Sequence, residues 1–216
     1  MSILFAINHD EPTKANFLMA QRIANQQDTT LFGPQATRNA LLSAIKSSNS
    51  KELFLMSHGS KDGPLDENKK EFITRSDAGA LAGAKVFAWA CRTGIRIGHE
   101  MAAQGIIWWG YDAAVTAPDE RERYAGVIAN VFMLAKNNFH QCSTRRSVEV
   151  LLSKIREECE SALKELDRLI EEDDDETEIL SILSTCAQFW QRLSVWIGND
   201  QKPLRHPLAP PAYIDI

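Results

Sequence analysis

The sequence has few cysteines, and none of them stand in a metal-binding or disulfide pattern. The four cysteines among 216 residues are Cys91, Cys142, Cys159 and Cys186, and no C-x-x-C pair occurs. Disulfide frameworks are typical of small secreted domains, so we expect a reducing, cytoplasmic compartment. We expect no zinc site, because no histidine has ligand spacing to a cysteine or carboxylate.

Long apolar runs, excess positive charge and phosphate-binding loops are also missing. No stretch approaches the roughly 20 apolar residues of a membrane-spanning helix, and the N-terminus lacks a signal-peptide pattern. With 24 Lys and Arg against 29 Asp and Glu, the net charge is −5, which argues against direct nucleic-acid binding. Gly79 and Gly83 match neither the Walker nor the dinucleotide pattern. We therefore expect no cofactor, no membrane span and no nucleic-acid partner.

The first half of the chain alternates strand-like and helix-like patterns. Short runs that are apolar on both faces predict buried strands at Ile3–Ile7, Thr29–Phe32, Leu53–Ser57, Lys85–Ala90 and Ile106–Gly110. Asp10, Thr37 and Ser76 can begin helices between these strands. Strands that alternate with helices imply right-handed crossovers, so the predicted fold class is α/β with a mainly parallel sheet.

The second half of the chain predicts helices. One begins near Thr116–Pro118, and two amphipathic helices flank the acidic segment Glu171–Glu176. We expect the last helix to carry Leu193 and Trp196, and the pair to form an αα-hairpin. The predicted organisation is a main domain, added helices on the same domain and an extended tail, which span residues 1–140, 147–197 and 198–216.

Two of the predicted strands end in residues that can perform chemistry. Leu53–Ser57 is followed by His58 and Gly59, and Lys85–Ala90 is followed by Cys91. Functional groups of an open parallel sheet collect beyond the carboxyl ends of its strands, so neighbouring strands would bring His58 and Cys91 to one edge. A nearby imidazole can remove the proton of a thiol and leave the thiolate, which is the nucleophile. A helix predicted to follow Cys91 would stabilise the negative charge of that thiolate. Backbone N–H groups of Gly59 and Cys91 would form an oxyanion hole for peptide or amide hydrolysis.

The order of these motifs resembles a known family. One strand ends in Ser57-His58-Gly59, a second ends in Ala90-Cys91-Arg92-Thr93-Gly94, and Gln104–Asp112 supplies a Gly-preceded strand and a Gly-x-Asp turn. This series resembles the caspase-like cysteine peptidases and, more closely, their bacterial CHAT branch, over roughly residues 3 to 139. The resemblance implies a three-layer αβα sandwich, with His58 as general base and Cys91 as nucleophile.

The resemblance also implies how such a protein acts. Members of this family cut proteins at restricted sites, and CHAT members often serve in bacterial immunity and regulated cell death under the control of a sensor or partner. We therefore expect a protein substrate and an activating protein partner, with the C-terminal helices as the docking surface for that partner.

The sequence departs from the caspase pattern around the nucleophile. The interval from the histidine to the cysteine is 33 residues, against about 50 in caspases. Trp89 and Thr93 stand where the caspase motif has Gln and Gly, so neither an acidic nor a basic P1 preference carries over. Asp10 and Asp112 follow other strands and are candidate substrate-binding residues, with turn or helix capping as the alternative for both.

Two other functions remain open from the sequence. A protein could keep this fold as a binding or scaffold protein without catalysis. A thiol acyl-transferase or amidase could also use a cysteine and a histidine on a similar sheet. Retention of biological effect in Cys91→Ala would favour the first, and modification of small amides would favour the second.

Overall fold

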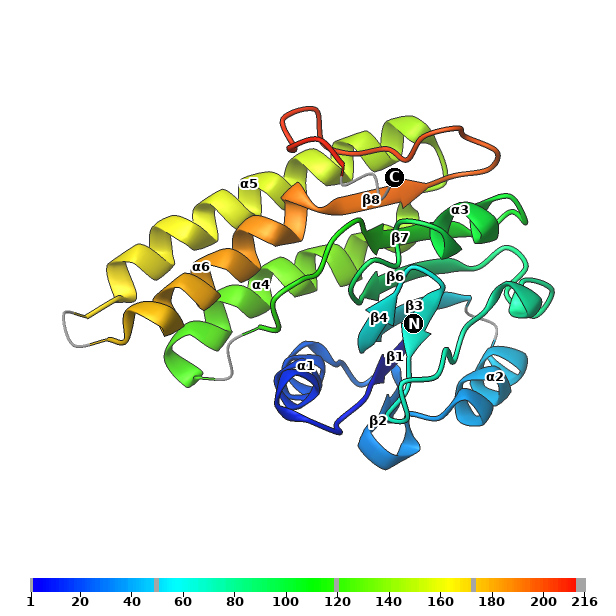
Figure 1. The fold of residues 1–216 in the computed structure, drawn as a ribbon, viewed down its shortest axis with the longest axis horizontal. Helices are drawn as coiled ribbons and strands as arrows, with labels where there is room; N and C mark the ends of the chain where they lie inside the picture. The colour runs from blue at the N-terminus through cyan, green and yellow to red at the C-terminus, as the bar shows by residue number, and fades with distance from the viewer. Residues whose placement is uncertain (1, 49–50, 119–120, 172–173, 213–216) are drawn as a thin grey trace.

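A six-stranded sheet forms the centre of the molecule (Figure 1). The structure is a computed structural model that describes residues 2–48, 51–118, 121–171 and 174–212. In sheet order the strands are β2 (Thr29–Phe32), β1 (Ile3–Ala6), β3 (Glu52–Met56), β6 (Lys85–Trp89), β7 (Ile107–Tyr111) and β8 (Leu193–Trp196). The first five strands are parallel, and β8 lies antiparallel to β7 at one edge. The predicted α/β class with a mainly parallel sheet is confirmed.

Helices cover both faces of this sheet. They are α1 (Glu11–Ile23), α2 (Arg38–Ser47), α3 (Ile97–Ala102), α4 (Glu122–Asn138), α5 (Arg145–Leu169) and α6 (Glu176–Gln191). A small antiparallel pair, β4 (His58–Ser60) and β5 (Gly63–Leu65), follows β3. Single 3-10 turns lie at Gly33–Gln35, Arg75–Asp77 and Phe139–Gln141.

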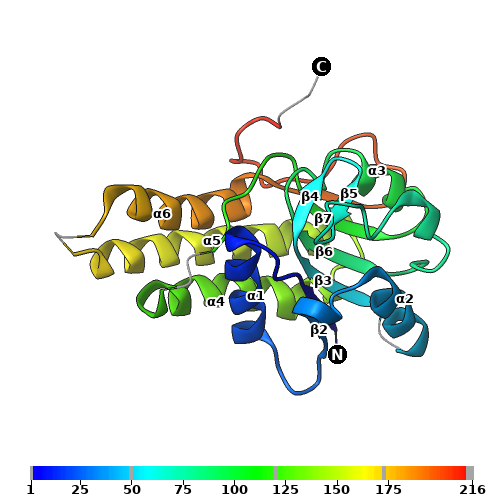
Figure 2. The same ribbon diagram turned by 60° about the horizontal axis from the view of Figure 1, so that its bottom comes forward.

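The two faces of the sheet carry separate hydrophobic cores. Alternate residues of each strand point to opposite faces, so Trp109 packs with α1, α4, α5 and α6 whereas Trp108 packs with α2 and α3. Figure 2 shows the strands between these two groups of helices, an arrangement compatible with a three-layer sandwich. Core packing on both faces explains why the strands are apolar throughout.

The strand order reverses direction at β1. The chain leaves β1 through α1 towards β2, and then returns through α2 to β3 on the other side of β1. Because both crossovers are right-handed in parallel sheets, they place α1 and α2 on opposite faces. The carboxyl ends of β1 and β3 therefore flank a topological switch point, where the crevice of such a sheet opens.

Three element boundaries differ from those expected from the sequence. The last helix ends at Gln191, and Leu193–Trp196 forms strand β8. Its alternation of Leu193 and Val195 with Ser194 suits a strand, and the open edge of β7 supplies the hydrogen-bonding partner. Helix α4 begins at Glu122 rather than near Thr116, and α3 begins at Ile97, six residues after Cys91.

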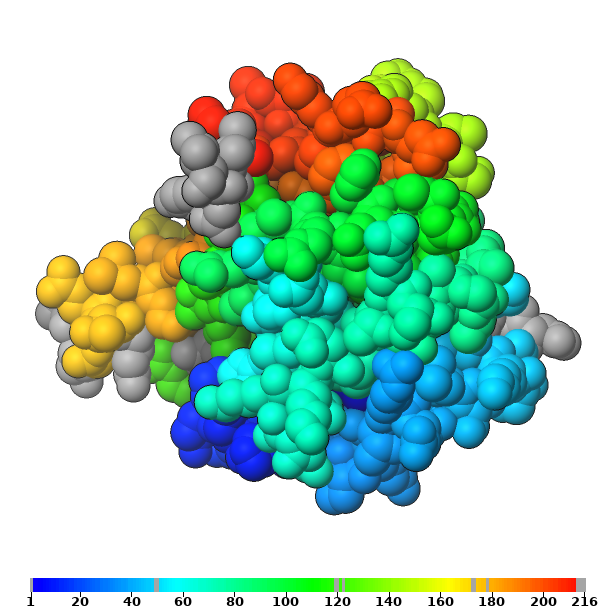
Figure 3. Space-filling model, turned by 45° about the vertical axis from the view of Figure 1, so that its right-hand side comes forward, coloured from blue at the N-terminus to red at the C-terminus, as the bar shows by residue number. Residues whose placement is uncertain are grey.

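Helices α4, α5 and α6 run side by side and extend beyond the sheet (Figures 1 and 2). Of the acidic segment 171–176, residues 172 and 173 lie outside the described residues, as do residues 213–216 of the tail. Asp174 forms an ion pair with Arg123 and accepts a hydrogen bond from Tyr124 Oη at 2.6 Å. The space-filling view shows the C-terminal segment, in orange and red, lying over the green central part of the chain (Figure 3).

Candidate functional site

The sheet brings the predicted histidine and cysteine to the same edge. Strands β3 and β6 are adjacent and parallel, and Met56 pairs with Trp89 in their shared register. His58 and Cys91 therefore each stand two residues beyond the same rung of the sheet. Asp10 follows β1, the neighbour of β3 on its other side. Residues from three adjacent strand ends thus gather where a parallel sheet places its functional groups.

Cys91 lies in a turn that exposes part of its side chain. It is the one cysteine of the four that is not buried; Cys142, Cys159 and Cys186 are buried. The next residue, Arg92, has a φ of 61°, which a side chain other than glycine seldom adopts. Arg92 N–H donates to Ala113 O at 3.0 Å, and Gly94 N–H donates to Tyr111 O at 2.8 Å. These bonds hold the turn in its strained form and fix the Cys91 backbone.

The expected helix dipole does not reach Cys91. Residues 91–96 form turns, and α3 begins only at Ile97. The partial positive charge of a helix acts within its first turn, so the sequence-based expectation that a helix N-terminus stabilises the thiolate is wrong. Any stabilisation of the thiolate must come from nearby side chains and backbone N–H groups, among them the Val115 N–H, which donates to Cys91 Sγ.

Two backbone N–H groups are candidate oxyanion donors. The Cys91 N–H donates to none of the described residues. Gly59 pairs with Pro64 across β4 and β5, and proline has no N–H to offer, so that pair cannot exchange two hydrogen bonds. The Gly59 Cα packs so closely on Cys91 that an added Cβ would lie 2.8 Å from Cys91 N.

His58 has an acidic partner. His58 Nε2 lies 2.7 Å from Asp10 Oδ2. The other oxygen, Asp10 Oδ1, accepts the Thr13 N–H at 3.1 Å, and Thr13 Oγ1 accepts the Asp10 N–H at 2.9 Å. This capping box at the start of α1 fixes the carboxylate in position. Burial alone raises the pKa of the Asp10 carboxyl, but hydrogen bonds from His58 and Thr13 outweigh it and lower that pKa to about 2.

Asp112, the other candidate substrate-binding residue, lies apart from this group. Its side chain is 5% exposed and forms an ion pair with Arg205 of the C-terminal segment at 3.1 Å. Arg205 in turn donates to Gln191 O and Pro210 O. Asp112 thus ties the end of β7 to the C-terminal segment. Asp10 follows the capping alternative and also contacts His58.

An open pocket of about 410 Å³ lies beside Cys91. It is lined by Gly59, Ser60, Lys61, Asp62, Cys91, Arg92 and Ala114. Asp62 forms an ion pair with Arg96. Trp89, which stands at the caspase glutamine position, does not line the pocket: it lies in the core, and its Nε1–H donates to Asn16 Oδ1 at 3.1 Å.

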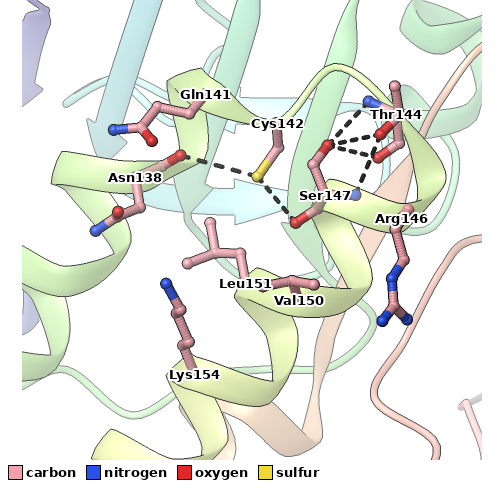
Figure 4. A pocket seen from close by; sticks show the side chains of 9 residues that line it. All are labelled: Asn138, Gln141, Cys142, Thr144, Arg146, Ser147, Val150, Leu151 and Lys154. Carbon is pink, nitrogen blue, oxygen red and sulfur yellow. Dashed lines mark hydrogen bonds between the residues drawn. The ribbon is translucent and has the colours of Figure 1, made fainter.

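The remaining cysteines are unsuited to act as nucleophiles. Figure 4 shows Cys142 among the residues that line a pocket between α4 and α5, with its thiol shared between the Asn138 and Ser147 carbonyl oxygens. Burial raises the pKa of the Cys142 thiol, raises that of Cys186 to about 12 and raises that of Cys159 well above its ordinary value. Their thiols therefore stay protonated at neutral pH.

Two contacts of the Cys91 side chain could not be found from the sequence. The Val115 N–H donates to Cys91 Sγ at 3.4 Å, and the Cys91 thiol donates to Val115 O at 3.8 Å. Gln188 on α6 accepts the neighbouring Thr116 N–H at 2.8 Å. These contacts join segments 24 and 72 residues apart, and no local motif marks them.

No family model matches the chain, and no curated protein sequence matches it. Within the part of the chain that the structure describes, no helix is long and apolar enough to cross a membrane. The same described residues include no group of three or more His, Cys, Asp or Glu side chains arranged to hold a metal ion.

Proposed function

We propose that this chain is a cysteine endopeptidase that makes limited cuts in a protein substrate. One observation carries the proposal: His58 and Cys91 follow adjacent parallel strands, each two residues beyond the same rung. A general base and a thiol at one sheet edge are the two groups that acyl transfer through a thioester requires. The partial exposure of Cys91 and the pocket beside it support access for a peptide.

In the first half of the proposed reaction, Cys91 attacks the scissile carbonyl. The thiol proton passes to His58 Nδ1, and Sγ bonds to the carbonyl carbon to give a tetrahedral oxyanion. The N–H groups of Gly59 and Cys91 are the donors we assign to this oxyanion, since the Cys91 N–H has no partner among the described residues and Gly59 packs directly on the Cys91 backbone. His58 then protonates the leaving amine, the C–N bond breaks, and a thioester remains on Cys91.

The second half of the reaction hydrolyses that thioester. His58 removes a proton from water, the resulting hydroxide attacks the thioester carbonyl, and the same N–H groups stabilise the second oxyanion. Collapse of this intermediate breaks the C–S bond, and His58 returns the proton to Sγ. The products are a free carboxylate and the regenerated thiol, so no co-reactant besides water is needed.

Asp10 fits this mechanism as a positioning residue. Its ionised carboxylate accepts the Nε2–H of His58, which keeps the neutral imidazole in the tautomer with an unprotonated Nδ1. The lone pair on Nδ1 is then available for the Cys91 proton. The same carboxylate favours the imidazolium that forms once the proton has moved.

The finer assignments of the proposal follow the sequence resemblance. We propose a caspase-like αβα sandwich of the CHAT type over residues 1–140, with α5 and α6 as a C-terminal helical hairpin. We further propose cytoplasmic action, activation by a partner or sensor protein, and a role in bacterial defence or cell death. The parallel sheet and the helices on both of its faces support this assignment.

Peptide cleavage tests the proposal. The protein is incubated with a proteome-derived peptide library, and new peptide termini are identified by mass spectrometry. We expect new termini with the wild-type chain and with Cys142→Ala, the matched control, and none with Cys91→Ala or His58→Ala. If wild-type and Cys91→Ala digests are identical, and peptidyl acyloxymethyl ketones also fail to label Cys91, the scaffold function is favoured. Modified small amides would favour the amidase instead.

A further inference from the structure

The segment between β7 and α4 crosses the Cys91 side chain. Residues 113–117 contact the turn after β6 at two points. Ala113 O accepts the Arg92 N–H at 3.0 Å, and Val115 contacts Cys91 Sγ through both its N–H and its C=O. The thiol proton is engaged in a hydrogen bond to Val115 O, and it is the proton that His58 must remove in the proposed reaction.

Helix α6 holds this segment from the other side. Gln188 Oε1 accepts the Thr116 N–H at 2.8 Å. The Thr185 hydroxyl lies 3.2 Å from both Ala117 O and Ser181 O, which share its one proton. The Gln188 amide is oriented by its own hydrogen bond from Nε2 to Ser184 Oγ at 2.8 Å. Thr185 is buried. Two side chains of α6 thus bind the residues directly after Val115.

A second contact links α6 to the same turn. Phe189, next to Gln188, stacks on Trp89 with ring centroids 5.0 Å apart. Trp89 ends β6 two residues before Cys91. Helix α6 therefore contacts both the strand that leads to Cys91, at Trp89, and the 113–117 segment that contacts Cys91 Sγ.

We propose that Gln188 and Thr185 are positioning residues that hold the 113–117 segment on the Cys91 thiol and restrain its reactivity. The inference rests on the proposed function for what the thiol does, but the restraint itself is a property of the resting protein. In this state the thiol donates to Val115 O at 3.8 Å, and Sγ accepts the Val115 N–H at 3.4 Å. Release of the segment frees the thiol to turn towards His58.

The restraint also makes α6 a route for regulation. Helices α5 and α6 project beyond the sheet, where a partner protein can reach them (Figure 1). A movement of α6 away from the 113–117 segment would break the hydrogen bonds that Gln188 and Thr185 form with it. Binding at a distance would thus change the state of the thiol through a defined pair of hydrogen bonds.

Alkylation of Cys91 by iodoacetamide tests this inference without a substrate. The full-length chain is used at pH 7, and each cysteine is followed separately by peptide mass spectrometry. Gln188→Ala is expected to raise the Cys91 rate about three- to tenfold, the range that corresponds to the loss of one hydrogen bond. Gln188→Glu keeps an acceptor oxygen for the Thr116 N–H and should stay within about twofold of wild type. Gln191→Ala, at the end of the same helix, is the matched control and should leave the rate unchanged.

The alkylation rates of the buried cysteines show whether a variant has lost core packing as a whole. Cys159 of α5 and Cys186 of α6 are buried in the core and should stay unreactive in every variant. If they react in Gln188→Ala, the comparison moves to Thr185→Val, which keeps the side-chain volume and removes only the hydroxyl. An unchanged or slower Cys91 rate in the folded variants, or an equal rise in Gln188→Glu, would overturn the inference.

The outcome is separable from that of the proposed function. Faster alkylation of Cys91 in Gln188→Ala together with no peptide cleavage by any form would support the restraint and refute the peptidase. Peptide cleavage that depends on Cys91 but is the same in Gln188→Ala, with unchanged alkylation, would support the peptidase and refute the restraint.

Discussion

At the scale of single residues, one carboxylate performs two tasks. Asp10 Oδ1 caps α1 through Thr13, and Oδ2 binds His58. The sequence marks the cap, because an aspartate that precedes a helical pattern is a common N-cap. It does not mark the contact with His58, because that contact joins residues 48 positions apart. It depends on β1 and β3 being neighbours in the sheet.

Asp10→Asn separates the two tasks. Asparagine is also a good N-cap, so the helix should keep its stability, but an amide cannot hold the imidazolium as a carboxylate does. We expect Cys91-dependent peptide cleavage to fall about 10- to 100-fold, the range seen when the partner of a metal-bound histidine is removed. The measurement is kcat/KM on a cleaved peptide, together with the melting temperature.

Thr13→Ala is the complementary control. It removes the other half of the capping box and should cost about 1 kcal/mol of stability while the contact between Asp10 and His58 remains. A loss of activity in Thr13→Ala together with unchanged activity in Asp10→Asn would mean that Asp10 acts only through the helix cap.

The pKa of Asp10 predicts a pH range for its contribution to stability. The pKa in the folded protein is about 2, below its ordinary value of 3.8. The contacts of the ionised carboxylate therefore stabilise the fold above about pH 4, and this contribution is lost as the pH falls towards 2. In urea unfolding, the difference between wild type and Asp10→Asn should shrink between pH 4 and pH 2.5. A difference that grows over this range would contradict the assignment.

At the scale of elements, the sequence predicts the five parallel strands but neither the antiparallel strand β8 nor the small pair β4 and β5. Strands β1, β3 and β6 are apolar runs, because helices cover both faces of the sheet and a side chain that points to either face must be apolar to be buried. The sequence predicts helix for the residues of β8, because Leu193 and Trp196 continue the helical spacing of the apolar residues in α6. The short strands β4 and β5 left no pattern, since three-residue strands with Gly and Pro lack periodicity. Their pairing depends on tertiary contacts.

Gly59→Ala tests whether the packing of β4 on the Cys91 turn supports the site. The added Cβ would lie 2.8 Å from Cys91 N and closer still to Cys91 O, so backbone must move. We expect Cys91-dependent cleavage to fall more than about 100-fold, the effect of losing an oxyanion donor, and stability to fall by about 1–3 kcal/mol.

Gly79→Ala is the matched control for this substitution. An added Cβ at Gly79 meets nothing within 4 Å, so activity should be unchanged. Full activity in Gly59→Ala would show that the Gly59 backbone does not contribute to the site.

At the scale of the whole molecule, the C-terminal elements are part of the core. Leu151, Ile155 and Cys159 of α5 pack in the same cluster as the sheet residues Trp89 and Trp109. Strand β8 covers the edge of β7. The sequence suggested an added pair of helices, because amphipathic helices joined by an acidic turn can stand apart from a domain. Which apolar face they cover is decided only by the assembled sheet.

Removal of residues 145–212 should therefore unfold the protein. The deletion exposes the α4 side of the sheet and the edge of β7, and an uncovered edge strand promotes aggregation. We expect the shortened chain to be insoluble or to lack a cooperative thermal transition by circular dichroism, whereas the full chain unfolds in a single transition. A soluble, cooperatively folded fragment would show that α5, α6 and β8 form a separable unit.

The most direct test of the central claim, that His58 activates Cys91, is the pH dependence of Cys91 alkylation in wild type and in His58→Ala. An ordinary thiol becomes reactive as the pH approaches its pKa near 8.5. We predict that Cys91 reacts faster at about pH 6 in wild type than in His58→Ala, and that releasing the thiol with Gln188→Ala widens this difference only where His58 is present. Identical profiles in the two proteins, both rising near pH 8.5, would contradict it.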